Sequence, residues 1–142
     1  MIDDTDKIID QQLLENGIKL FMYDRSRVTA GDRWQVALEC KAYIPVDESF
    51  WDMVGDEDPQ LLQDIKKILG DRMEFVTTRQ RNFIDAKEYE TVLQGMVQQV
   101  SDSILEYMKK PHFPREFFKK QYREAHQNLL IRKAMNSSKG NC

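Results

Sequence analysis

The chain has 142 residues, which is the size of one ordinary domain, and 41% of them are hydrophobic. With 32% charged residues and a net charge of -3, this composition excludes a disordered chain, a collagen-like chain and a membrane-spanning protein. The acidic start, MIDDTDK, lacks the apolar segment of a secretory signal. We therefore expect a cytoplasmic protein that does not contact a membrane.

The first two predicted elements are a helix over residues 3–15 and a strand over residues 18–25. Acidic residues and a threonine at the start of the helix can cap it, and the glycine of the pair Asn16-Gly17 can end it. In the strand, apolar side chains occupy every second position. We place a hairpin connection at residues 26–32, which contain the next glycine.

A second strand over residues 33–44 has the clearest pattern in the chain. One face is predicted to be buried and carries Trp34, Val36, Leu38, Cys40, Ala42 and Ile44. The residues between them are mostly polar, so the other face should be wetter. Pro45 lacks an amide hydrogen and should end the pairing.

The middle of the chain begins with an acidic loop over residues 47–58, which contains six carboxylates and the pair Phe50-Trp51. A helix should follow from Pro59, with Asp58 as its cap and Gly70 at its end. A third strand is predicted over residues 73–81.

Two helices are predicted in the last third of the chain. The first begins after Asp85 and continues to about Lys109, with apolar residues at steps of three and four. The second covers residues 115–135 and is separated from the first by two prolines. Residues 136–142 are predicted to form a flexible polar tail.

These elements, in the order α-β-β-α-β-α-α, predict an α+β fold. A small, mainly antiparallel sheet of three strands should pack against helices, and the last two helices should form a C-terminal helical hairpin. We expect a single domain over residues 1–135. The position of the third strand in the sheet is open.

The charge is unevenly distributed along the chain. Residues 1–110 have a net charge of -8, and residues 111–142 have a net charge of +5. Basic side chains that could bind nucleic acid lie on the third strand and on the last helix: Arg79, Arg81, Lys119, Lys120 and Arg123. In the other interpretation these cations pair with the protein's own carboxylates, those of the acidic loop among them.

Sequence motifs of catalysis are absent from the chain. The two cysteines and two histidines lack the spacing of a zinc site, and no nucleophile elbow, phosphate-binding loop or dinucleotide-binding glycine pattern occurs. We therefore predict no catalytic residue, no metal, no cofactor and reduced cysteines, and we favour a protein that is not an enzyme. A small enzyme remains an alternative, and it would need a pocket where carboxylate, histidine and arginine side chains converge.

The helical hairpin carries more apolar surface than a three-stranded sheet can cover. Five apolar side chains gather at its turn: Tyr107, Met108, Phe113, Phe117 and Phe118. The sequence thus favours a non-catalytic interaction or regulatory module that uses this surface to bind a protein partner or to form a homodimer. The alternative function is nucleic-acid binding through the basic residues named above.

Overall fold

The computed structural model describes residues 8–140 and the side chains of residues 8–136. The chain divides into two compact units. The first unit takes the chain up to Ile44 together with Glu74–Pro111, and the second takes Pro45–Met73 with the chain from His112 onward. The single domain predicted over residues 1–135 stays a prediction.

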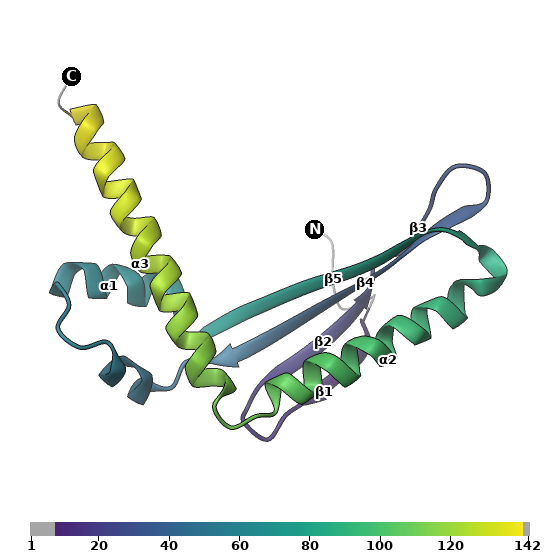
Figure 1. The fold of residues 1–142 in the computed structure, drawn as a ribbon, viewed down its shortest axis with the longest axis horizontal. Helices are drawn as coiled ribbons and strands as arrows, with labels where there is room; N and C mark the ends of the chain where they lie inside the picture. Colours follow the sequence, from purple (N-terminus) through teal and green to yellow (C-terminus); the bar gives the residue numbers. More distant parts are fainter. Residues whose placement is uncertain (1–7, 141–142) are drawn as a thin grey trace. The chain divides into compact units, whose positions relative to one another are not determined.

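The first unit is built on an antiparallel sheet, which has five strands within the described residues (Figure 1). They are β1 (Ile8–Leu13), β2 (Lys19–Asp24), β3 (Arg27–Val28), β4 (Arg33–Pro45) and β5 (Arg72–Asp85). β4 is central: β2, β3 and β5 all pair with it, and β1 pairs with β2. An α+β fold with an antiparallel sheet is confirmed, but the prediction of three strands is wrong.

The order of elements also differs from the prediction, and the largest difference lies at the start of the described chain. Residues 8–13 form strand β1 instead of a helix, with side chains alternating between half-buried and exposed. Asn16 and Gly17 form the turn to β2, where the Leu14 amide donates to the Ile18 carbonyl at 2.9 Å. Asn-Gly is the dipeptide that favours tight hairpin turns. Residues 3–7 of the predicted helix lie outside the described residues.

One face of the sheet forms the core of the first unit. In β4 the alternation is as predicted, since Val36, Leu38, Cys40, Ala42 and Ile44 are all buried. Trp34, at the start of this face, is half-buried. β2 adds Leu20 and Met22, which lie opposite Ala42 and Cys40 in the antiparallel register. A shift of one residue would turn all of these side chains to the other face, so burial determines the register.

Helix α2 (Tyr89–Met108) runs along this sheet (Figure 1). Its buried side chains follow steps of three and four: Leu93, Met96, Val100, Ile104 and Met108. Polar and aromatic contacts hold both ends of the helix in the unit. The Tyr89 ring packs 4.9 Å from that of Trp34, its hydroxyl donates to the Asp24 carboxylate, and Asn16 Nδ2 donates to the Met108 carbonyl at 2.7 Å.

The second unit contains helices α1 (Pro59–Leu69) and α3 (Phe113–Gly140), which pack against each other (Figure 1). α1 has the predicted ends, with the Asp58 carboxylate accepting from the Leu61 amide at 3.1 Å and Gly70 at its C-cap. The predicted acidic loop contains a 3-10 helix, η2 (Glu48–Met53). Within this unit the rings of Phe50 and Trp51 pack 5.4 and 5.0 Å from that of Phe118.

The predicted C-terminal helical hairpin is not confirmed. α2 belongs to the first unit and covers the sheet, whereas α3 belongs to the second unit and packs on α1. α3 also begins at Phe113, with Pro114 in its first turn, and continues to Gly140 instead of ending at Met135. Residues 136–140 of the predicted tail are therefore helical in their backbone, and residues 141–142 lie outside the described chain.

Candidate functional site

The five apolar residues predicted to bind a partner differ in exposure. Met108, Phe113 and Phe118 are buried, Phe117 is half-buried, and Tyr107 is 56% exposed. The most buried of them serve as core residues of the units to which they belong. The role of this group in binding a partner stays a prediction.

An exposed apolar surface lies further along α3 instead. Leu130, Ile131 and Met135 are 48%, 59% and 57% exposed, and we call these three residues the distal face. Leu129, one residue earlier, is buried at 8% exposure. Successive residues of an α-helix are about 100° apart, so Ile131 lies about 200° around the helix from Leu129. The helix thus has a buried apolar residue on one side and exposed apolar residues on another.

This second face has a signal in the sequence that the prediction missed. Leu129, Leu130 and Ile131 are three consecutive apolar residues, and together they extend about 200° around a helix. One stripe packed on a neighbour is narrower than that. Leu130 is accordingly exposed although its neighbour Leu129 is buried.

The basic residues of the nucleic-acid alternative belong to both units. Arg79 and Arg81 lie on β5 in the first unit, are exposed, and form no ion pair among residues 8–136. Lys119, Lys120 and Arg123 are exposed on α3 in the second unit. Lys119 is partly neutralised, since its Nζ lies 3.4 Å from the Glu116 carboxylate.

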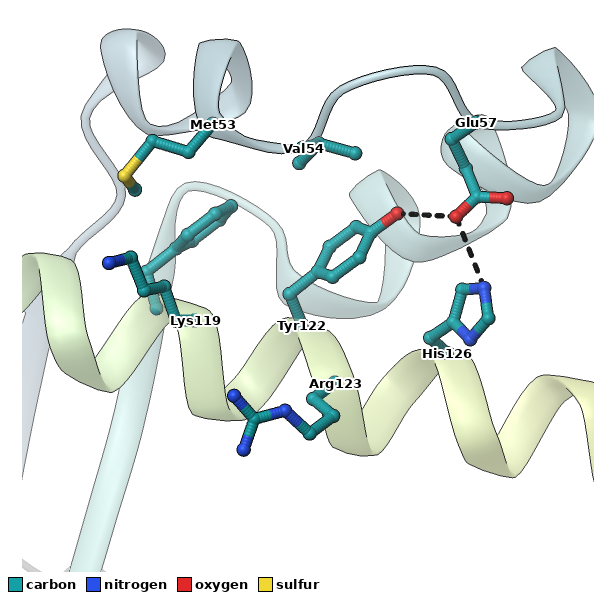
Figure 2. Close-up of a pocket in the computed structure, with 8 residues that line it drawn as sticks. Met53, Val54, Glu57, Lys119, Tyr122, Arg123 and His126 are labelled. Atoms are coloured by element: carbon teal, nitrogen blue, oxygen red, sulfur yellow. Dashed lines mark hydrogen bonds and ion pairs between the residues drawn. The ribbon is translucent and has the colours of Figure 1, made fainter.

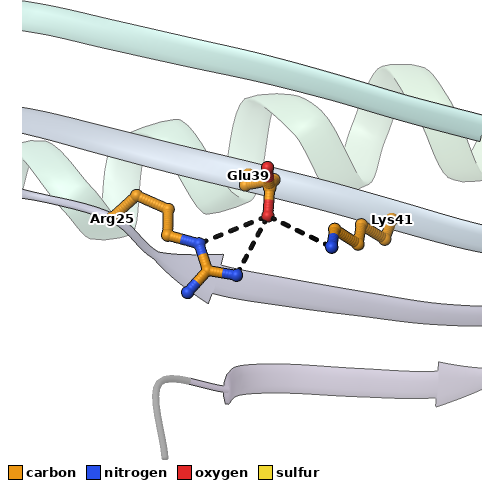
Figure 3. Close-up of polar contacts among 3 residues, drawn as sticks. All are labelled: Arg25, Glu39 and Lys41. Carbon is orange, nitrogen blue, oxygen red and sulfur yellow. Dashed lines mark hydrogen bonds and ion pairs between the residues drawn. The ribbon is translucent and has the colours of Figure 1, made fainter. Parts of the chain in front are cut away.

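Arg79 lines a cavity of about 380 Å³ on the sheet together with two other arginines, Arg25 and Arg27. Figure 3 shows that Arg25 is engaged, because its guanidinium donates to Glu39 Oε1 at 3.1 and 3.2 Å. Lys41 Nζ lies 3.8 Å from the same oxygen. Arg27 Nε donates to the uncharged Gln35 side chain at 3.0 Å, so Arg27 and Arg79 both lack an ion pair in the described part of the chain.

One aromatic side chain of this sheet face, Tyr23, is covered by cations. Arg25 and Lys41 lie over the ring of Tyr23, at 4.7 and 5.5 Å from its centroid. Only 5% of Tyr23 is exposed, whereas Phe21 and Tyr43, with ring centroids 5.8 Å apart, are half-buried. Bases of a single strand could reach Phe21 and Tyr43 more easily than Tyr23.

A second cavity, of about 340 Å³, lies in the second unit (Figure 2). We call it the Glu57 pocket. Its lining combines apolar side chains, one carboxylate, one histidine and two cations: Met53, Val54, Glu57, Phe118, Lys119, Tyr122, Arg123 and His126. The first three precede α1, and the other five come from the N-terminal half of α3.

Glu57 is the centre of a hydrogen-bonded cluster in this pocket. Its Oε2 accepts from the Tyr122 hydroxyl at 2.9 Å and lies 3.1 Å from His126 Nε2. Its Oε1 accepts from the Asp58 amide at 3.1 Å. Tyr122 and His126 are four residues apart on one helix, so both side chains extend from α3 toward the same carboxylate (Figure 2).

The ionisation of this cluster follows from its hydrogen bonds. The Tyr122 hydroxyl, and then the Asp58 amide and His126, lower the pKa of Glu57 below its ordinary value of 4.5. Burial and the neighbouring carboxylate raise the pKa of Tyr122 to about 12. At neutral pH the cluster therefore contains an ionised carboxylate that accepts from a protonated phenol.

The sequence analysis did not identify the carboxylate that contacts His126. The acidic residue near it in the sequence is Glu124, but residues two apart on a helix do not face each other. The actual partner, Glu57, comes from a distant segment, and no local pattern indicates it. The pocket brings together the carboxylate, histidine and arginine side chains that the small-enzyme alternative requires.

The cysteine of the first unit does not belong to a reactive site. Cys40 is 1% exposed, and burial together with the nearby Asp10 carboxylate raises the pKa of its thiol to about 12. The nucleophilic thiolate is therefore scarce at neutral pH. Among the residues that the structure describes, no three side chains of the metal-ligating types His, Cys, Asp and Glu form a group suited to a metal ion.

Comparisons with known proteins do not indicate a function for this chain. No helix within the described residues combines the length and the apolar content needed to cross a bilayer. The chain matches no protein-family model, no curated protein and no solved structure.

Proposed function

We propose that this protein is a non-catalytic interaction module that associates with a second copy of itself through the distal face of α3. The observation that supports this proposal is the exposure of Leu130, Ile131 and Met135 on a helix whose buried residues, such as Leu129, lie on another face. A helix with a second apolar face gains stability when a partner covers that face.

The size of the distal face implies a weak association. Burying the exposed half of a Leu, Ile or Met side chain is worth about 1 kcal/mol. A dimer that covers three such side chains on each copy must also offset the loss of translational and rotational freedom. The six side chains together give about 6 kcal/mol before this loss is subtracted, so we expect the dissociation constant to be in the millimolar range.

The charge around the distal face gives the dimer a distinctive salt dependence. Residues 127–140 contain Arg132, Lys133 and Lys139 and no acidic residue. Two copies would bring these like charges together, and dissolved salt screens their repulsion. Self-association should therefore strengthen as salt is added, whereas binding of an acidic protein partner would weaken.

Sedimentation equilibrium of the full chain, at concentrations up to the millimolar range and at two salt concentrations, tests this proposal. We expect a monomer–dimer equilibrium that Ile131→Gln abolishes. Ile68→Gln is the matched control, because Ile68 is 54% exposed on α1 and lies outside the distal face. A monomer under all conditions, or a dimer that Ile131→Gln leaves unchanged, would contradict the proposal.

Nucleic-acid binding is the second candidate function, and the arginines of β5 favour it. Arg79 and Arg81 are exposed without an ion pair in the described part of the chain, and Arg79 shares a cavity with Arg25 and Arg27. Guanidinium groups bind phosphate oxygens through paired hydrogen bonds.

A further inference from the structure

The Glu57 pocket has the composition of a small-molecule site. Its volume of about 340 Å³ falls in the range of ligand cavities in proteins. Met53, Val54 and the buried ring of Phe118 supply apolar wall, and the polar groups of Glu57, Tyr122 and His126 lie together at one side (Figure 2). Such a mixture lets an apolar body bind while a few polar groups determine its orientation.

We propose that the Glu57 pocket binds a small organic acid, with one carboxylate group on an apolar or aromatic body. The carboxylate of the ligand would pair with Arg123 and Lys119, and its body would contact Phe118 and the ring of Tyr122. This inference is independent of the proposed self-association, which uses the distal face of the same helix.

The charges of the lining select a monoanion. Arg123 and Lys119 contribute two positive charges, and Glu57 contributes one negative charge because its carboxyl group stays ionised at neutral pH. Arg123 forms no ion pair among the residues with described side chains, and Lys119 shares its charge with Glu116. The lining therefore has at most one uncompensated positive charge, which one carboxylate balances. A phosphate dianion would bring excess negative charge close to Glu57.

The hydrogen bonds of Glu57 argue against a cationic ligand. Its Oε2 already accepts from Tyr122 and lies 3.1 Å from His126 Nε2, and its Oε1 accepts from the Asp58 amide. Little acceptor capacity remains for an ammonium group. An ammonium group would also be repelled by Lys119 and Arg123, which line the same cavity.

NMR titration of the ¹⁵N-labelled full chain with 4-phenylbutyrate tests this proposal. Phenyl phosphate and 4-phenylbutylammonium, which replace the carboxylate by a dianion and a cation, serve as comparison ligands. We expect 4-phenylbutyrate to shift the amide signals of Val54, Glu57, Tyr122 and His126 in a saturable manner, and the two comparison ligands to bind more weakly.

Arg123→Gln should weaken 4-phenylbutyrate binding about tenfold, because it removes a charge-assisted hydrogen bond to the carboxylate of the ligand. Arg132→Gln removes a charge from the same helix outside the pocket and should leave binding unchanged. Ile131→Gln should also bind as the unmodified chain does, which separates this site from self-association. Amide spectra of each variant show whether it folds, and Lys119→Gln replaces Arg123→Gln if the latter does not.

Three results would overturn the proposal. The first is the absence of saturable shifts with 4-phenylbutyrate. The second is equal or tighter binding of phenyl phosphate or 4-phenylbutylammonium, which would show that the pocket does not select a monoanion. The third is unchanged binding by a folded Arg123→Gln or Lys119→Gln variant.

Discussion

The Tyr122 hydroxyl donates a 2.9 Å hydrogen bond to Glu57 Oε2, although 65 residues separate the two in the chain. The same oxygen lies 3.1 Å from His126 Nε2. These contacts connect the segment before α1 with α3, which places them among the interactions that hold the second unit together. They also keep Glu57 ionised and Tyr122 protonated at neutral pH.

The Glu57 contacts predict how the stability of the protein depends on pH. The pKa of Glu57 is lower in the folded chain than its ordinary value of 4.5, so the ionised form is stabilised by folding. This stabilisation is fully present above pH 4.5 and is lost as the pH falls through the lower, folded value. Glu57→Gln should therefore lower the free energy of unfolding most at neutral pH, with a difference that shrinks in acid.

Urea unfolding followed by tryptophan fluorescence, from neutral pH to below 4.5, measures this effect. Glu48→Gln is the control, because Glu48 is an exposed carboxylate in the same acidic segment. If the difference between the Glu57→Gln variant and the unmodified chain were the same at every pH, the carboxylate would not be stabilised as the structure indicates.

The arginines of β5 predict how nucleic-acid binding would depend on salt. If Arg79 and Arg81 contact phosphates, replacing each by Gln should reduce the slope of log affinity against log salt concentration by about one. Fluorescence anisotropy of a labelled single-stranded oligonucleotide provides the measurement. Lys67→Gln, an exposed cation on α1, is the control and should leave the slope unchanged. No binding at low salt would rule out this candidate function.

The burial of Cys40 predicts a slow thiol reaction. Its pKa of about 12 and its 1% exposure leave almost no accessible thiolate near neutral pH. In a Cys142→Ser variant, which leaves Cys40 as the one thiol of the chain, labelling by a disulfide reagent should be slow and should accelerate as urea opens the first unit. Labelling of the native variant at the rate of its urea-unfolded form would show that Cys40 is accessible.

The elements predicted best are those whose sequence pattern is compatible with only one secondary structure. The strict alternation over residues 33–44 indicates a strand with one buried face, and β4 has that face. Asp58, Pro59 and Gly70 define both ends of α1, because capping and helix termination depend on neighbouring residues alone.

Residues 8–13 were predicted wrongly because their local pattern favours a helix. The apolar residues Ile8, Ile9, Leu13 and Leu14 suggest a helical stripe, and apolar and polar residues do not alternate through the segment as they do in a half-buried strand. Pairing with β2 through the Asn16-Gly17 turn decides for the strand. Tertiary contacts commonly override local preference in this way.

The sequence by itself determined the α+β class, the central strand β4, the ends of α1 and the uneven charge of the two parts of the chain, because each depends on composition or on residues close together. Only the tertiary structure decided the strand β1, the burial of Phe118, the exposure of the distal face and the meeting of Glu57 with Tyr122 and His126. These features depend on which distant segments come into contact. No spacing along the chain encodes that choice, since it reflects how all the apolar surfaces are covered together.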